Sequence, residues 1–417
     1  MLRPLDEIDP FGPDVLVDPF ELDHRLRREA PVHRDPKSGV FLVSTYELVL
    51  AAARDFETFS NHFASAAGAL GLGVADDDPQ ITQFQKQSFP IVDTMLTADP
   101  PEHRRFRGLV NRAFTPRRVE GLRDAIRGLC HDLVDAFADA GTCEVLADYA
   151  VPLPLRIIAD QLGVSRADLP HFKRWTDGFT ARLSGIAQGE EAALAMNRIL
   201  EFQHYFAVRI DEAARAPRDD ILSDLGRARV EGERPLDVGE QLSILQQLLV
   251  AGNETTANAI AEGVRHLALD PGLFQHIADQ PALLPGFVEE VLRLASPLQG
   301  MWRRASRDAE LGGVAVPQGS LVLLRYGSAN RDESVFRDPD RLDPGRRNAV
   351  DHLAFGHGIH FCLGAALARS ELRAAFGVLL ERVERLRLEG NAAPRYRPSI
   401  LLRGLSELRV TFAPRLH

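Results

Sequence analysis

Few cysteines and no long apolar runs limit what this chain can be. Its 417 residues contain only three cysteines, Cys130, Cys143 and Cys362, so we expect no disulfide framework and a reducing, cytoplasmic environment. Nowhere do about 18 apolar residues follow one another, and the acidic start, Met1–Pro10, has no apolar run. We therefore expect no membrane span, membrane anchor or secretory signal. A net charge of −10 argues against general nucleic-acid binding.

The chain also lacks a linker, a repeat or a low-complexity block. We therefore expect residues 1–417 to form one large domain, which buries enough surface for a deep internal pocket. A loop of small residues, 64–74, would suit a lid over such a pocket or form a disordered surface insertion.

Helical periodicity dominates from about residue 99 to about residue 295. The most apolar segment lies near the end of this region and is hydrophobic on most faces, so it should cross the core. Short strands are predicted near residues 31–60 and 300–325. The expected class is mainly α with minor β hairpins. The patterns predict helices over 18–30, 101–113, 119–140, 146–162, 166–183, 190–214, 237–269 and 289–295, and a hairpin over 32–43.

The most specific motif is a glycine-punctuated loop, residues 355–364, that carries Cys362. An amphipathic stretch follows it directly and is predicted to continue to residue 382. The sulfur therefore lies at a helix N-terminus, where free N–H groups and the helix dipole favour a thiolate. The glycines let the backbone approach a flat, bulky group. A thiolate in this setting suits a single axial bond to a haem iron, and the alternative is a buried, inert cysteine.

A polar interruption, residues 251–256, lies within the apolar helix predicted over 237–269. Threonine hydroxyls there can compete for backbone carbonyls and open the helix locally. A buried acid beside a hydroxyl, as in Glu254 and Thr255, could deliver protons to a bound ligand. The alternative is a helix kink that side chains satisfy.

Two further patterns pair charged groups on one helix face. Glu290 and Arg293 lie three residues apart among apolar neighbours, so they form either a solvated ion pair or a buried architectural lock. His103 and Arg107 lie four residues apart, and cationic donors at this spacing can clamp one carboxylate. The alternative is an ordinary basic surface helix.

Together these four elements resemble the cytochrome P450 family of haem-thiolate monooxygenases, in its soluble bacterial form. The resemblance covers the chain in the family's order and implies its single triangular domain. Glu290, Arg293 and Arg346 match the family's three-residue lock, with Arg347 as the alternative for the third member. The cysteine loop is the most specific match, through Phe355, Gly356, Gly358, His360, Cys362 and Gly364.

The resemblance implies haem b as the cofactor and Cys362 as its axial ligand. It places Glu254 and Thr255 on the oxygen side as the acid–alcohol pair, where Thr255 contacts the dioxygen and Glu254 relays protons. The arginine expected to bind a haem propionate is Arg303, and the adjacent Arg304 is the alternative. The residues expected to bind haem are His103, Arg107, Ala251, Gly252, Arg303, Phe355, Gly356, His360, Cys362 and Gly364. The expected substrate pocket comprises Phe89, Ile91, Met95, Val250, Ala251, Pro297, Leu298 and Leu401.

The implied reaction activates dioxygen and hydroxylates or epoxidises a small hydrophobic molecule, such as a terpenoid, a steroid or an aromatic compound. Electrons must come from outside, because the chain has no flavin or nicotinamide domain, and the expected donor is a ferredoxin with its reductase. We expect a monomer that binds neither nucleic acid nor membrane. The alternatives are a peroxide-driven enzyme, a haem-based sensor and a cofactor-free helical binding protein. The arginines that would attract an acidic ferredoxin, unless they are merely scattered and solvated, are Arg104, Arg105, Arg112, Arg117, Arg118, Arg369 and Arg373.

Overall fold

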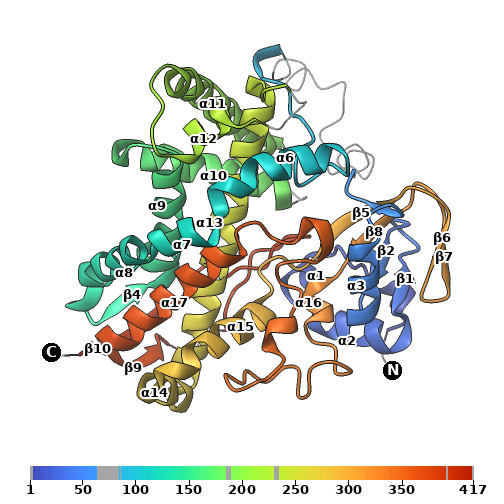
Figure 1. The fold of residues 1–417 in the computed structure, drawn as a ribbon. Coiled ribbons are helices and arrows are strands. Elements are labelled where there is room, and N and C mark those ends of the chain that lie inside the picture. The colour runs from blue at the N-terminus through green and yellow to red at the C-terminus, as the bar shows by residue number, and fades with distance from the viewer. Residues whose placement is uncertain are drawn as a thin grey trace.

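Helices make up most of the protein, as predicted, and the main sheet lies at one side of them (Figure 1). The computed structural model describes residues 3–62, 84, 86–184, 189–229, 234–390 and 393–415. The loop predicted over residues 64–74 lies outside these ranges. Within the described ranges, no helix is both long and apolar enough to cross a membrane.

The long helix α13, Val238–Leu269, runs through the middle of the molecule (Figure 1). Its start is fixed by a capping box, in which the Asp237 side chain accepts from the Glu240 N–H and the Glu240 side chain accepts from the Asp237 N–H. Most of its side chains are buried, as its apolar faces predict. The expected opening at residues 251–256 is not present, because the helix is continuous there.

Helices on one side of α13 build a large apolar cluster. Helix α10, Leu169–Ser184, packs on α11, Gly189–Arg215, through aromatic rings such as Trp175 and Phe202, whose centroids are 6.0 Å apart. The helix predicted over 146–162 is divided at Pro152, which has no N–H to donate. A π-helical turn, Leu146–Ala150, precedes α9, Pro152–Gln161.

Helix α17, Ala365–Arg382, crosses α13 and also packs against α8, Arg123–Ala138, and α15, Leu284–Ala295 (Figure 1). The crossing is close because Gly263 of α13 has no side chain. A Cβ at that position would lie 2.2 Å from the Phe376 ring of α17. Nearer the start of α17, Glu371 hydrogen-bonds Thr256 of α13, so the first half of α17 lies beside the middle of α13.

The main sheet has five strands in the order β1–β2–β8–β5–β3. The predicted hairpin over 32–43 forms strands β1, Val32–Arg34, and β2, Phe41–Val43, with Val32 opposite Val43. Strand β2 also pairs in parallel with β8, Leu321–Leu324, which joins segments almost 300 residues apart in the chain. Local patterns do not predict such a pairing, because strand partners are chosen by tertiary packing.

The remaining elements complete these layers. A three-stranded sheet has the order β4–β10–β9, and β6 and β7 form a separate hairpin. The helix predicted over 119–140 is two helices, α7 and α8, and the short helices α3, α12 and α14 were not predicted. The bounds not yet given are α1 Pro13–Val17, α2 Phe20–Glu29, α3 Tyr46–Arg54, α6 Glu102–Val110, α7 Pro116–Gly121, α12 Ile221–Arg227, α14 Pro271–Asp279, α16 Tyr326–Ala329, β3 Phe59–Ser60, β4 Thr142–Glu144, β5 Met301–Ala305, β6 Ala309–Leu311, β7 Val314–Val316, β9 Val383–Leu388 and β10 Arg409–Pro414.

Candidate functional site

The loop that carries Cys362 is held by its own backbone. The Cys362 N–H donates to the Phe355 carbonyl at 2.9 Å, which closes the loop just before α17. Gly356 and Gly358 have φ angles of +65° and +74°, which favour glycine. A Cβ at Gly358 would also lie 2.7 Å from the Ala53 carbonyl oxygen. The glycines therefore let the loop turn sharply and pack against α3.

Burial and nearby polar groups act on the Cys362 thiol in opposite directions. Burial raises the pKa of the Cys362 thiol, although the Gly364 N–H and the charges of Arg107 and Arg369 act in the opposite direction. The Gly364 N–H at the start of α17 therefore acts as the sequence predicts, although burial outweighs it. Coordination to a metal favours loss of the proton, because the thiolate is the form that ligates.

The middle of α13 has an open side, although most of the helix is buried. Ala251 is exposed, and a Cβ added to Gly252 would meet no atom within 4 Å. Val250, next to Ala251, packs on the same apolar cluster as Leu363, which follows Cys362. The open side of α13 and the cysteine loop therefore border one region of the molecule.

The predicted acid–alcohol pair lies at this open side. The Thr255 hydroxyl donates to the Ala251 carbonyl at 2.7 Å, and the Glu254 carboxylate accepts from Arg397 at 2.9 Å. Arg397 was not predicted as a site residue. It lies 143 positions later in the chain, and no local pattern indicates such a contact.

A second unpredicted group lies behind the pair. Glu371 of α17 is buried and hydrogen-bonds the Thr256 side chain. Burial raises the pKa of Glu371 to about 8, although the Thr256 hydrogen bond acts against the shift. Glu371 lies in a polar stretch, Arg369–Arg373, between apolar residues of a predicted helix. This was the signal in the sequence that could have indicated a buried acid.

The predicted anion clamp brings together residues from three parts of the chain. His103 of α6 and His360 of the cysteine loop have ring centroids 4.5 Å apart, and Arg303 of β5 is 1% exposed. Arg304 is exposed, so the strand turns Arg303 inward. Arg107 donates to the Phe361 carbonyl at 2.6 Å.

The imidazoles of this cluster keep unused hydrogen-bonding atoms. Within the described part of the chain, both ring nitrogens of His103 are buried without a hydrogen-bond partner, and Nε2 of His360 lies 3.8 Å from Asp99 Oδ1, beyond hydrogen-bond distance. Burial, helped by His360 and Arg107, lowers the pKa of His103 to about 4. Buried polar atoms without partners are costly, so they point to a polar ligand at this place.

These observations test whether the predicted haem fits, and it does. The Cys362 sulfur lies at one side, and Gly252 in the open stretch of α13 adds no Cβ. The buried Arg303 and the imidazole nitrogens without hydrogen-bond partners suit two carboxylates. Cys362 would hold the iron. His103, Arg107, Arg303 and His360 would bind the carboxylates.

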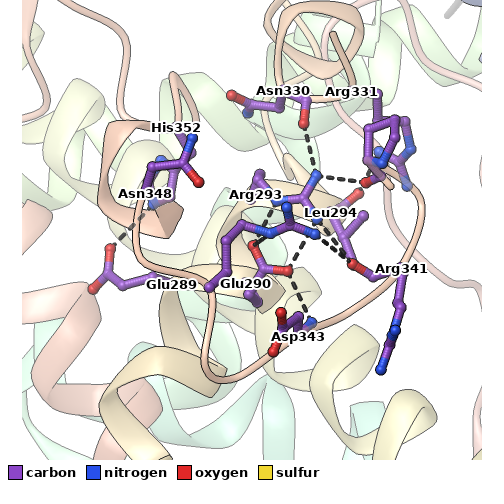
Figure 2. A network of polar contacts seen from close by, with 12 residues as sticks. Glu289, Glu290, Arg293, Leu294, Asn330, Arg331, Arg341, Asp343, Asn348 and His352 are labelled. Atoms are coloured by element: carbon purple, nitrogen blue, oxygen red, sulfur yellow. Dashed lines mark hydrogen bonds and ion pairs between the residues drawn. The ribbon is translucent and has the colours of Figure 1, made fainter. Parts of the chain in front are cut away.

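Glu290 and Arg293 meet in a buried network (Figure 2), which Arg346 also joins. Arg293 donates twice to Glu290, at 2.6 and 3.0 Å. Arg346 approaches the same carboxylate, with its Nε 3.0 Å from Glu290 Oε1, whereas Arg347 is exposed. The lock members are therefore together, and Arg346 rather than Arg347 is the third. Arg293 also donates to the carbonyls of Asn330, Pro339 and Arg341.

A neighbouring network involves residues that the sequence did not assign to it. Arg369 of α17 donates twice to Glu289 at 2.8 Å and stacks over the Phe355 ring. His352 lies 3.2 Å from the same carboxylate (Figure 2). Burial tends to raise the pKa of Glu289, but His352 and Arg369 outweigh it and hold this pKa at about 2. The network ties the cysteine loop to the helix that carries the lock.

Six of the eight predicted pocket residues fall into two groups. Phe89, Met95 and Val250 belong to the cluster between α13 and the α10–α11 pair. Leu298 and Leu401 belong to a second cluster beside the main sheet, with Pro297 buried next to them. Ile91 belongs to neither group and is 53% exposed.

The predicted basic patch is only partly exposed. Arg105 pairs with Glu240, Arg118 with Asp224 and Arg369 with Glu289, so these three side chains are bound within the fold. The side chain of Arg112 lies outside the described part of the structure. The exposed members are Arg104, Arg117 and Arg373.

Known proteins are similar to this chain over most of its length. The family model described as Cytochrome P450 matches residues 187–403. Cytochrome P450 107B1 of Saccharopolyspora erythraea is 38% identical over 95% of this chain and 98% of its own length. A steroid C26-monooxygenase of Mycobacterium tuberculosis is 35% identical over 93% of this chain and 99% of its own length.

Solved structures give the same result. The structure of cytochrome P450 CYP109Q5 from Chondromyces apiculatus matches with a TM-score of 0.86 and 36% identity, covering 99% of this chain and 100% of that one. The structure of CYP109E1 from Bacillus megaterium in complex with testosterone matches with a TM-score of 0.83 and 30% identity, covering 96% and 99%.

Proposed function

The chain belongs to the cytochrome P450 family, and from this premise we propose that it hydroxylates a hydrophobic molecule of steroid size with electrons from a separate ferredoxin. The predicted family, the mainly helical fold, the monooxygenase class and the haem b cofactor are confirmed by the relatives. The substrate, the electron donor and the roles of individual residues are the proposal.

We assign the cofactor contacts from the geometry described above. Cys362 is the axial ligand, and His103, Arg107, Arg303 and His360 bind the propionates. When bound, haem supplies the oxidising chemistry that places one oxygen atom of dioxygen into a C–H bond. The protein supplies position and protons.

Thr255 and Glu254 are the proposed proton-handling groups on the open side of α13. The Thr255 hydroxyl donates its single proton to the Ala251 carbonyl, and its lone pairs can accept a hydrogen bond at the same time; to pass the proton on, the hydroxyl must turn away from that carbonyl. Glu254 is largely buried but pairs with the half-exposed Arg397, so it lies between solvent and the site. This arrangement suits a proton path from solvent to Thr255. A peroxide-driven enzyme has less need of such a path.

The steroid assignment rests on the relatives. One is named a steroid C26-monooxygenase, and a structural neighbour of 30% identity is described in complex with testosterone. Phe89, Met95 and Val250, together on one apolar cluster, favour an apolar ligand of this kind. Hydroxylation at an unactivated carbon is the reaction that such a ligand offers.

The ferredoxin assignment rests on Arg104, Arg117 and Arg373, which stay exposed on an otherwise acidic protein. Exposed cations can steer an acidic partner toward this face. Replacing Arg117 and Arg373 by glutamine should lower the rate of reduction by a plant-type ferredoxin, most strongly at low salt. Arg28→Gln on α2 is the control, because that arginine is also exposed but lies on another element.

The substrate proposal is tested by optical titration of the haem protein with testosterone. We expect testosterone to shift the haem Soret band and, with a ferredoxin system, to yield a hydroxylated product. Hexadecenoic acid and 4-ethylphenyl phosphate are the comparison ligands, since related structures are described with an acyl-ligated carrier protein and with that phosphate. A shift with either of these and none with testosterone would overturn the steroid assignment.

A further inference from the structure

The segment before β10 folds into a short hairpin, residues 395–406, which we call the C-terminal hairpin. Its two arms are joined by backbone hydrogen bonds from Arg397 to the Gly404 carbonyl at 3.0 Å and from Ser406 to the Arg395 carbonyl at 2.8 Å. Tyr396 also pairs with Leu405 across the arms. The hairpin is therefore a small unit of its own.

One face of α13 receives this hairpin. Glu254, Asn258 and Glu262 are spaced four residues apart, so they share a helix face. Arg397 donates to Glu254 at 2.9 Å, and Arg403 donates to Glu262 at 3.3 Å. Two arginines of the hairpin thus bind the first and the last member of one stripe.

The middle of the stripe is in close contact with the hairpin backbone. A Cβ at Gly404 would lie 2.1 Å from Asn258 Oδ1, so only glycine fits without a shift. Asn258 is 1% exposed, and neither polar atom of its side chain has a hydrogen-bond partner among the residues that the structure describes. The hairpin backbone therefore packs directly on α13 at Asn258.

The two arginine contacts differ in burial. At the Glu262 end, the side chains of Arg403 and Glu262 are 8% and 3% exposed, and Arg265 binds the same carboxylate at 2.8 Å. At the Glu254 end, the Arg397 side chain is 46% exposed. The Glu262 end is a firm anchor, and the Glu254 end can open at little cost because half-exposed ion pairs are weak.

The tip of the hairpin reaches the predicted substrate pocket. The Gln299 N–H donates to the Leu401 carbonyl at 2.7 Å, and Leu298 pairs with Leu402. Leu298 and Leu401 are both among the proposed pocket residues. One short hairpin thus joins the pocket wall at its tip to Glu254 at its stem.

We propose that Arg397 is a positioning residue that holds Glu254 in place through the C-terminal hairpin, so that contact at the hairpin tip changes the position of this acid. The inference rests on the proposed function, since it assigns Glu254 to proton delivery. Without Arg397, a nearly buried carboxylate loses its cationic partner and its fixed position. Proton delivery then slows, and more of the reducing equivalents end in hydrogen peroxide.

The test uses the haem-loaded protein with a plant-type ferredoxin and its reductase, without added substrate. For Arg397→Gln we expect a two- to fivefold higher amide exchange rate in residues 395–406 and a solvent deuterium isotope effect on oxygen consumption raised by a similar factor, about what loss of a half-exposed ion pair implies. Arg397→Lys should restore both. Arg395→Gln is the matched control, because Arg395 is on the same hairpin but binds Glu407 at 3.4 Å instead of α13.

A double variant separates positioning from general damage. If Arg397 acts through Glu254, the isotope effect of Glu254→Gln/Arg397→Gln should equal that of Glu254→Gln alone. The inference is overturned if Arg397→Gln behaves like Arg395→Gln, or if the double variant is worse than Glu254→Gln. Failure of the proposed function has another signature, since Glu254→Gln alone would then leave the isotope effect of the wild type unchanged.

Discussion

Replacing Arg293 by lysine tests whether the buried network around Glu290 holds the haem-binding half of the molecule together. Arg293 is fully buried and donates five hydrogen bonds, two to Glu290 and one each to the carbonyls of Asn330, Pro339 and Arg341 (Figure 2). Lysine keeps the positive charge but has three donors on a single nitrogen. At least two of the five bonds must therefore be lost.

The cost follows from the number of lost bonds. A hydrogen bond to or from a charged group contributes about 1.5–3 kcal/mol, so two lost bonds cost about 3–6 kcal/mol. This agrees with the roughly 3–5 kcal/mol expected when a buried ion pair is broken. The whole stability of a domain is about 5–15 kcal/mol, so we expect Arg293→Lys to unfold at much lower urea and to lose haem.

The assay is urea unfolding of the haem-loaded protein, followed by far-UV circular dichroism and by haem absorbance. Arg347→Lys is the control, because Arg347 is exposed beside the lock member Arg346 and should change stability by less than about 0.5 kcal/mol. The reasoning is refuted if Arg293→Lys lies within about 1 kcal/mol of the wild type, a margin below the weakest charged hydrogen bond. A lysine at position 347 that costs as much as one at 293 would refute it too.

Three further predictions concern the haem site and pH. Cys362→Ala should remove the Soret shift of the reduced carbon monoxide complex, and an unchanged spectrum would exclude Cys362 as the ligand. Arg303→Gln should release haem to apomyoglobin about tenfold faster or more, whereas Arg304→Gln should not, because only Arg303 is buried. His266 has a pKa lowered to about 4 by burial and by Arg265. The unfolded chain therefore binds the proton first, and stability falls as pH drops from about 6.5 to about 4, by at most about 3 kcal/mol. His266→Gln should reduce this fall in acid unfolding curves, and an identical pH dependence would contradict the assignment.

The features that could be predicted from the sequence are those with local signals. Helix α13 begins after Asp237 because Asp237 and Glu240, three positions apart in the chain, form a capping box. Its burial follows from its apolar faces. The cysteine loop is equally local, since its glycines and Cys362 are neighbours in the chain. The match of this loop to the haem-binding motif of cytochromes P450 then identified the family from a few residues, and the relatives confirm that family.

The features that could not be predicted depend on which way a side chain turns. Neighbours in a strand point to opposite faces, so one of Arg303 and Arg304 had to lie inside, but only the position of β5 in the sheet decides which. Arg346 and Arg347 pose the same choice in a loop, and contact with Glu290 decides it. Arg397 and Glu254 are 143 positions apart in the chain, and local spacing rules do not predict contacts at such a separation.

The arginines also show why charge in a sequence is a poor guide to an interface. Arg105, Arg118 and Arg369 looked like members of a patch for an acidic partner, yet each binds a carboxylate of the fold. Such pairs have no net charge that could attract an acidic partner, because the neighbouring carboxylate cancels the field of each guanidinium. If a ferredoxin binds this face, the exposed Arg104, Arg117 and Arg373 must carry the attraction, and Arg369→Gln should act through stability and haem retention rather than through the association rate.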